Sequence, residues 1–289
     1  MPAGEGDPAV ADRPVPATPD VTVVMPACNP GPFLRESVES VMGQSYGAWH
    51  LLIVDDGSTQ DLSVYLPCTL DRRRLTIVRH AVNRGQSAAL NTALRHVQTP
   101  YFLQLDPDDL LLPEAVELLR NALAACPPTT ALVSANIRVI YADDEEPPVV
   151  RVGAPFRRGD RYRLLLHNKA VWPRFYRTEA LRRVGGWPTN GPYEGRYLED
   201  RRMMYRLIEA HSLAWINQVV YIYRRHGGNI TVLHAREHNE LVRYVVGECL
   251  RRWGGRFRPV FRRAEGSLLL VALRPAGLGR KSRRRRLSL

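Results

Sequence analysis

Three carboxylates crowd into four positions where an apolar run ends. The segment YFLQLDPDDLLLP, residues 101–113, places Asp106, Asp108 and Asp109 directly after a stretch typical of a buried strand. Carboxylates this close repel one another unless a cation lies among them. Asp106 and Asp108 suit a hard divalent cation, Mg²⁺ or Mn²⁺, bound together with diphosphate oxygens. The alternative is that Asp108 or Asp109 only caps the helix expected to begin near Pro113.

Two other apolar runs end in polar groups in the same way. Cys28 and Asn29 follow the run at 21–27, and Asp55 and Asp56 follow the run that begins at His50. In open α/β sheets, ligands bind beyond the carboxyl ends of the strands. We therefore expect one crevice to collect all three polar groups, and a metal there would prepare it for an anionic nucleotide.

The elements that must position these groups alternate along the first half of the chain. Strands are expected at 21–27, at 75–80 and within HLLIVDDGST and YFLQLD, and helices after Pro32, at 85–97 and from about 113. Such alternation predicts parallel βαβ units and an α/β fold, with a mostly parallel sheet flanked by helices. Later segments predict a helix at 198–210, a strand at 219–226 and a long helix at 233–253.

Charge and composition divide the chain. The 289 residues carry a formal charge of +12, and residues 251–289 hold 13 basic residues against one acid, so residues 1–250 are neutral overall. We predict a disordered leader at 1–20, one domain at 21–232 with halves at 21–112 and 113–232, and a C-terminal helix and basic tail at 233–289. The leader has no apolar core and does not resemble a signal peptide.

The composition also bears on location and partners. Four scattered cysteines predict no zinc site or disulfide framework, which fits a reducing, cytoplasmic location. No apolar run is long enough to span a bilayer. The apolar stretch and arginine cluster of the tail could lie on an anionic membrane surface or form a solvated tail, whereas nucleic acid binding lacks a supporting motif.

Five ordered motifs between about Val21 and Thr231 resemble the family 2 glycosyltransferases, which have the GT-A fold. The motifs are VTVVMPACNPGPFLRESVESVMGQSYGAWHLLIVDDGSTQD, NRGQSAALNTAL, LDPDD, VGGWP followed by LEDRRMMYRL, and YRRHGGNIT. LDPDD occupies the place of the metal-binding DxD motif of that family. Each motif alone is weak, and their order makes the resemblance specific.

The resemblance assigns roles to individual residues. It implies that Asp56 hydrogen-bonds the nucleotide base, that Asp106 and Asp108 hold the metal beside the donor, and that Asp200, with Glu199 beside it, is the general base. His226 is implied as a third metal ligand or diphosphate contact. The remaining residues implied to line or flank the nucleotide are Pro26, Ala27, Cys28, Asn29, Arg84, Gly85 and Asn91.

Several of these residues could instead have purely structural roles. Glu199 and Asp200 could simply complement the dipole of the helix that they begin, and His226 could be an ordinary loop or core histidine. Trp187, after two glycines, could stack on a sugar face or fill the core. Cys28 stands where the family usually has an aromatic residue, and Leu90 stands where a basic residue is common.

The implied reaction is metal-dependent, inverting transfer of a sugar from a nucleotide diphosphate, most commonly a UDP-sugar, to an acceptor hydroxyl. The Q-x-x-R-W signature of processive synthases is absent, which favours one sugar per encounter. We expect a carbohydrate or lipid-linked acceptor in cell-envelope polysaccharide or glycolipid synthesis, with the enzyme cytoplasmic or peripheral at the inner membrane face. The alternatives are a nucleotidyltransferase and a non-catalytic sugar-nucleotide-binding protein on a related fold. The sequence does not identify the sugar, the base or the acceptor.

Overall fold

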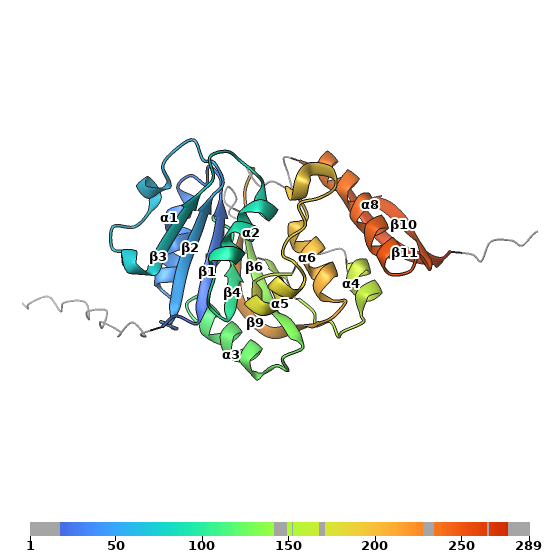
Figure 1. Ribbon diagram of the computed structural model, residues 1–289, viewed down its shortest axis with the longest axis horizontal. Coiled ribbons are helices and arrows are strands. Elements are labelled where there is room, and N and C mark those ends of the chain that lie inside the picture. Colours follow the sequence, from blue (N-terminus) through green and yellow to red (C-terminus); the bar gives the residue numbers. More distant parts are fainter. Residues whose placement is uncertain are drawn as a thin grey trace, which may run out of the picture.

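A nine-stranded mixed sheet forms the centre of the protein, in the order β3-β2-β1-β4-β8-β6-β9-β5, with β7 paired to β6. The computed structural model describes residues 18–141, 149–151, 153–167, 171–227, 234–264 and 266–276 (Figure 1). The strands are β1 (Val21–Ala27), β2 (Trp49–Asp55), β3 (Leu75–Arg79), β4 (Tyr101–Gln104), β5 (Leu110–Leu111), β6 (Thr130–Tyr141), β7 (Val149–Arg151), β8 (Arg174–Arg177) and β9 (Ser212–Arg225).

Most strands of the sheet share one direction. β1 pairs parallel with β2 and β4, β2 with β3, and β6 with β9. β8 is antiparallel to both β4 and β6, so β6 and β9 run in the same direction as β1, whereas β5 and β7 run in the opposite direction. The predicted mostly parallel α/β sheet is confirmed.

Helices cover both faces of the sheet. They are α1 (Phe33–Met42), α2 (Gln86–His96), α3 (Ala115–Ala125), α4 (Arg161–His167), α5 (Thr178–Arg183), α6 (Glu199–Leu207) and α8 (Ala235–Arg252), with 3-10 turns at Leu62–Tyr65, Arg72–Arg74 and Pro192–Gly195. Alternate strand residues point to opposite faces. Val23 and Met25 accordingly join a core with α1 and α3, whereas Val24 joins a core with α2, α5, α6 and α8.

The predicted strands and helices of the first half lie within one to three residues of the observed ones. The observed β9 is longer than the predicted strand at 219–226, because β6 pairs with it along most of its length. The short elements β5, β7 and α4 were not expected from the pattern. They carry too few residues to display a period.

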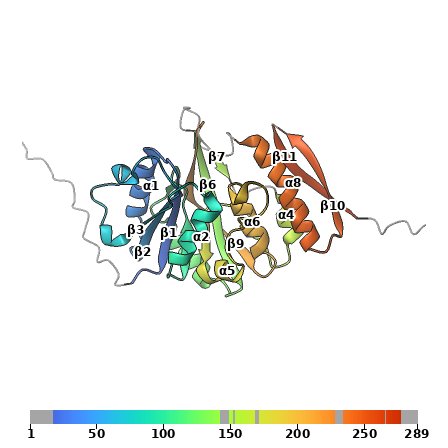
Figure 2. The same cartoon turned by 45° about the horizontal axis from the view of Figure 1, so that its top comes forward.

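The predicted C-terminal helix is confirmed as α8, but a hairpin follows it within the segment predicted as a tail. After α8 the chain forms a hairpin of β10 (Phe257–Ala264) and β11 (Ser267–Pro275), which lies with α8 at one end of the molecule (Figures 1 and 2). The apolar run considered as a membrane-surface segment is β11, and it buries Leu268 and Leu270 in the core that α6 and α8 share. The arginine cluster at 280–286 and most of the leader lie outside the described residues.

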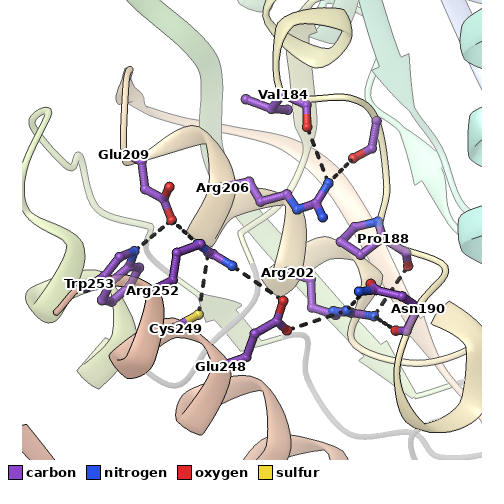
Figure 3. A network of polar contacts seen from close by, with 11 residues as sticks. Val184, Pro188, Asn190, Arg202, Arg206, Glu209, Glu248, Cys249, Arg252 and Trp253 are labelled. Carbon is purple, nitrogen blue, oxygen red and sulfur yellow. Dashed lines mark hydrogen bonds and ion pairs between the residues drawn. The ribbon is translucent and has the colours of Figure 1, made fainter. Parts of the chain in front are cut away.

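Charged groups fasten α8 to α6 (Figure 3). Arg202 of α6 is buried and reaches Glu248 of α8 at 3.5 Å, while Glu209 accepts from Arg252 at 2.6 Å and from the Trp253 indole at 2.7 Å. Arg202 also donates to the backbone and side chain of Asn190, both at 3.0 Å. The C-terminal helix is therefore built into the domain. In the described residues, no helix has the length and apolar character that crossing a membrane requires.

Candidate functional site

A cavity of about 720 Å³ opens beyond the carboxyl ends of β1, β2 and β4. This volume lies in the range of small-molecule sites. The wall contains most of the residues singled out from the sequence, which come from segments far apart in the chain: Pro26, Ala27, Cys28, Asn29, Asp56, Gly85, Asp106, Asp108, Glu199, Asp200 and His226. The structure thus brings the strand-end polar groups and the α6 acids into one hollow, as the sequence predicts.

Three of the predicted nucleotide-binding residues are not in the described lining of this cavity. Trp187 is 2% exposed and packs edge-on against Tyr176, so it is a core aromatic and cannot stack on a sugar. Asn91 holds the backbone of Trp187 through two hydrogen bonds, both 2.8 Å. The Arg84 side chain is exposed outside the cavity lining, and this residue contributes its backbone N–H, as described next.

Asp56 organises the loop before α2. Its carboxylate accepts from the backbone N–H groups of Arg84 at 2.9 Å and Gly85 at 2.7 Å, and its Oδ1 lies 2.6 Å from Nδ1 of His80. His80 is buried, and its other ring nitrogen contacts Thr92. A carboxylate has about four acceptor positions. Three of these positions are used, so Asp56 can accept one more hydrogen bond in the cavity while it holds the loop in place.

Gly85 permits a close approach between this loop and the segment before α6. Its φ is +88°, and a Cβ at this position would lie 2.7 Å from Cγ of Arg196. Arg196 then donates to the side-chain and backbone oxygens of Asn83. Both Asn83 and Arg196 line the cavity, so glycine at position 85 lets the two halves of the site meet.

Arg174 is the cation that lies among the acids, and sequence reasoning missed it. Its Nη2 lies 2.6 Å from Asp106 Oδ2 and its Nη1 lies 3.4 Å from Asp200 Oδ2, with the residue 2% exposed. Burial lowers the pKa of the guanidinium, but Asp106 and Asp200 outweigh burial and raise it. The signal was an arginine between Pro173 and Phe175, in a segment that includes Trp172 and Tyr176. Buried arginines are rare unless paired.

Asp109 has a structural role, and no acid of the 106–109 segment caps the following helix. The N-cap of α3 is Glu114, without a side-chain cap bond. Asp109 is fully buried, accepts from the Tyr221 hydroxyl at 2.7 Å and from the Arg224 N–H at 2.8 Å, and so ties β5 to β9. Burial and the neighbouring acids Asp108 and Asp106 raise its pKa well above the usual range.

Asp108 and His226 are the pair best placed to hold a cation. Their Oδ2 and Nε2 atoms lie 3.0 Å apart. Burial and Asp106 raise the pKa of Asp108, and the His226 contact opposes this rise. In the described part of the chain, no three His, Cys, Asp or Glu side chains group tightly enough to form a cage. Mg²⁺ sites on nucleotides need only one or two protein ligands, since phosphate and water complete the coordination. The residues present therefore fit a metal that arrives with a diphosphate.

Asp106 is a weaker candidate metal ligand than Asp108. Its Oδ2 accepts from Arg174, whereas Oδ1 accepts long hydrogen bonds of 3.4 Å from the amides of Gln86 and Gln104. Among the residues that the structure describes, Oδ1 is thus the more weakly bonded of the two oxygens.

Glu199 and Asp200 occupy the first turn of α6 at the cavity wall. Leu198 before them has φ +54°, a left-handed backbone that a leucine adopts only at a cost. Burial and the Asp200 charge raise the pKa of Glu199 to about 8, so Glu199 is mostly protonated at neutral pH. Asp200 accepts from the Arg201 N–H at 2.6 Å and faces Arg174. Of the two acids, Asp200 is the one that contacts the Arg174 guanidinium.

Comparisons with known proteins agree with this geometry. The sequence profile described as Glycosyl transferase family 2 matches residues 22–185. The chain belongs to this family. It is 27% identical to chondroitin synthase of Escherichia coli over 82% of its own length. It spans only 33% of that protein and 26% of another curated relative.

Two solved structures share the fold. TarS of S. aureus, residues 1–349 in complex with UDP-GlcNAc, matches with a TM-score of 0.59 and 18% identity, over 80% of this chain and 66% of that one. The mannosyltransferase PcManGT of Pyrobaculum calidifontis, in complex with GDP-Man and Mn²⁺, matches with a TM-score of 0.57 and 23% identity, over 81% and 65% of the two chains. This glycosyltransferase therefore has the GT-A fold.

Proposed function

We propose that this glycosyltransferase moves a sugar from a nucleotide diphosphate donor to an acceptor hydroxyl with inversion, in a metal-dependent reaction. The observation that carries the proposal is the Arg174 bridge, which joins the donor-side acid Asp106 to the α6 acid Asp200 in one cavity. A donor-side anion site and a base therefore face one shared space. UDP-sugar is the proposed donor class, as in the TarS complex.

Asp200 is the proposed general base. A hydroxyl is a poor nucleophile at neutral pH, and a carboxylate that takes its proton as the bond forms is worth about 10²–10⁴-fold in rate. Glu199 is mostly protonated at neutral pH and is unsuited to this task. With one base and one direct displacement, attack on an oxocarbenium-like anomeric carbon inverts its configuration.

The donor side rests on the other strand ends. Asp56 keeps one acceptor position for a base N–H, and the segment 26–29 lines the same wall. Asp108 and His226, with Oδ1 of Asp106, would hold Mn²⁺ or Mg²⁺. When bound, the metal would neutralise the charge that develops on the departing nucleoside diphosphate. Arg174 contributes a fixed positive charge beside Asp106.

Assays with the full chain test this function. Nucleotide release would be measured with a panel of sugar nucleotides and Mn²⁺ or Mg²⁺, and donor binding by thermal shift. Asp200→Asn should keep UDP binding and lose about 10²–10⁴-fold in transfer, whereas Asp160→Asn on the surface should change neither. Asp108→Ala should lose metal dependence and donor affinity together. Full turnover by Asp200→Asn would remove that residue from the mechanism.

The same panel separates the rival functions. A nucleotidyltransferase would form a sugar nucleotide and release pyrophosphate, and a non-catalytic binding protein would bind donor without turnover. The proposed carbohydrate or lipid-linked acceptor, and cell-envelope synthesis at the inner membrane face, stay proposals. Partition of the full chain between membrane and supernatant, with and without residues 277–289, tests the membrane part.

A further inference from the structure

His80 is a buried histidine that none of the five sequence motifs includes. It follows β3 directly and is 8% exposed, and its backbone N–H donates to the Asp55 carbonyl at 2.8 Å. Its ring lies between Asp56, which lines the cavity, and Thr92 of α2. His80 itself is outside the described lining of the cavity, so any effect of this ring on a ligand must pass through a neighbour.

The carboxylate of Asp56 determines which tautomer this ring adopts. A carboxylate only accepts hydrogen bonds, so the hydrogen in the 2.6 Å contact is on Nδ1 of His80. The other ring nitrogen, Nε2, lies 2.9 Å from the Thr92 hydroxyl, whose oxygen accepts from Nη2 of Arg95 at 2.8 Å. That hydroxyl still has its own hydrogen to donate to Nε2 of a neutral ring. Donation therefore runs in one direction, from Arg95 through Thr92 and His80 to Asp56.

The hydrogen bonds to Asp56 are distributed unequally between its two oxygens. Oδ1 accepts from His80 and from the Arg84 N–H, whereas Oδ2 accepts from the Gly85 N–H. Each carboxylate oxygen has about two acceptor positions. Among the described contacts, the position that is left is therefore on Oδ2. The His80 bond holds Oδ1 on the buried side of the carboxylate and so leaves Oδ2 for a ligand.

We propose that His80 is a positioning residue for the nucleotide base, because it holds Asp56 in the orientation in which Oδ2 accepts a base N–H. The inference rests on the proposed function, which places a nucleoside diphosphate in this cavity. It goes further because it gives a role in donor binding to a side chain that does not reach the donor.

Burial makes the His80 bond hard to replace. Asp56 is 3% exposed, so water has little access to the place that the ring would vacate. Hydrogen bonds to an ionised group are stronger than those between neutral groups, and bonds in a chain polarise one another. Without the ring, only the two backbone N–H groups would orient the carboxylate, and Oδ2 would no longer be held at one angle to the cavity.

Two substitutions at position 80 separate positioning from packing. His80→Phe keeps a planar ring and removes both ring nitrogens. His80→Asn places its Nδ2 where Nδ1 of the histidine lies, so it still donates to Asp56 but does not reach Thr92. His50→Phe is the matched control, because His50 contacts Thr76 at 2.9 Å in the same sheet and is outside the described cavity lining.

Isothermal titration calorimetry with the full chain and Mn²⁺ compares UDP with inorganic pyrophosphate, which has no base. His80→Phe should weaken UDP binding about 10-fold, the effect of a lost hydrogen bond to a charged group, and leave pyrophosphate binding unchanged. His80→Asn and His50→Phe should bind UDP within about 3-fold of wild type. In donor turnover, His80→Phe should raise KM and leave kcat unchanged, because the base is held equally in the ground state and the transition state.

Three results would overturn the inference. They are equal UDP affinity in His80→Phe and wild type, equal losses in His80→Phe and His80→Asn, and a parallel loss of pyrophosphate binding in His80→Phe. Far-UV circular dichroism checks that each variant folds. If His80→Phe does not fold, Thr92→Val takes its place, since it removes the hydroxyl beside Nε2 and keeps the side-chain shape. It should weaken UDP binding about 3-fold, and unchanged affinity would count against the chain of donors.

UDP binding by the wild type separates this inference from the proposed function. If the wild type binds UDP and His80→Phe binds it equally well, the positioning role fails alone. If the wild type binds no nucleoside diphosphate, the donor assignment fails and the role of His80 fails with it.

Discussion

Arg174→Met tests whether one buried cation holds the site together. The substitution keeps an unbranched stem and much of the volume of the side chain but removes the guanidinium, and with it the charge between Asp106 and Asp200. Those contacts are 2.6 and 3.4 Å long, and the Arg174 side chain is 3% exposed. Removal therefore leaves two carboxylates near each other with no cation between them, which is a larger perturbation than the loss of a surface pair.

The expected cost follows from this burial. Removal of one partner of a buried ion pair costs about 3–5 kcal/mol. The Asp106 and Asp200 side chains are 20% and 11% exposed, so water reaches them and the lower end of that range, about 3 kcal/mol, applies. For a chain of this size, that free energy lowers the melting temperature by about 6–12 °C.

Calorimetry and donor turnover measure the two consequences. Arg174→Lys retains the charge but cannot span both acids as a guanidinium does, so it should recover part of the stability and less of the turnover. Arg73→Met is the matched control, because its pair with Asp71 is on the surface and its side chain is 88% exposed. If Arg174→Met melts within 2 °C of wild type and turns over normally, the bridge is not what organises this site.

Three further predictions follow from individual residues. Glu199→Gln should flatten the pH dependence of the free energy of unfolding. Burial raises the pKa of Glu199 to about 8. Between about pH 4.5 and 8 the folded protein therefore keeps a proton that the unfolded chain has released. Wild-type stability should fall from pH 5 to 8 with a slope of at most about 1.4 kcal/mol per pH unit from this group, and an unchanged slope in urea titrations of the variant would contradict the reasoning. Gly85→Ala should destabilise by about 1–3 kcal/mol because its φ is +88°, whereas Gly43→Ala, with ordinary φ, should be nearly neutral by thermal melting; equal melting of the two would count against a strained loop. Asn91→Ala should cost about 1–3 kcal/mol through its lost bonds to Trp187 and leave UDP affinity unchanged, and a large loss of affinity would return Asn91 to the nucleotide site.

The parts of the fold that the sequence predicts are those with a repeating pattern. β1, β2, α2 and α3 follow from apolar runs and helical spacing, and the chemistry at their ends follows from the rule for strand termini. The C-terminal hairpin did not follow, because a single apolar run such as 267–275 has the same composition whether it pairs with another strand or lies on a membrane. Only the contact with β10 decides between these states.

The residues of the candidate site also divide into those that the sequence predicts and those that it does not. Acids such as Asp106 and Asp200 stand out in the sequence by type and context, so they were found. Arg174 lies 68 positions from Asp106 and 26 from Asp200, and only the antiparallel pairing of β8 with β4 brings it between them. The sequence leaves Trp187 open between a sugar contact and the core, because a residue type alone does not reveal which side of a turn its ring occupies.

Helix α6 carries Asp200 in its first turn and, two residues later, Arg202, which pairs with Glu248 of α8 (Figure 3). A short helix moves as a rigid rod, so a disturbance at Glu248 would reach Asp200 as a small rotation and not as a broken contact. A saturation mutagenesis screen scored by sugar transfer would then return positions along α8 that mimic catalytic residues although they never meet substrate. Screening the same library for donor binding would expose them, because their nucleotide affinity should be intact.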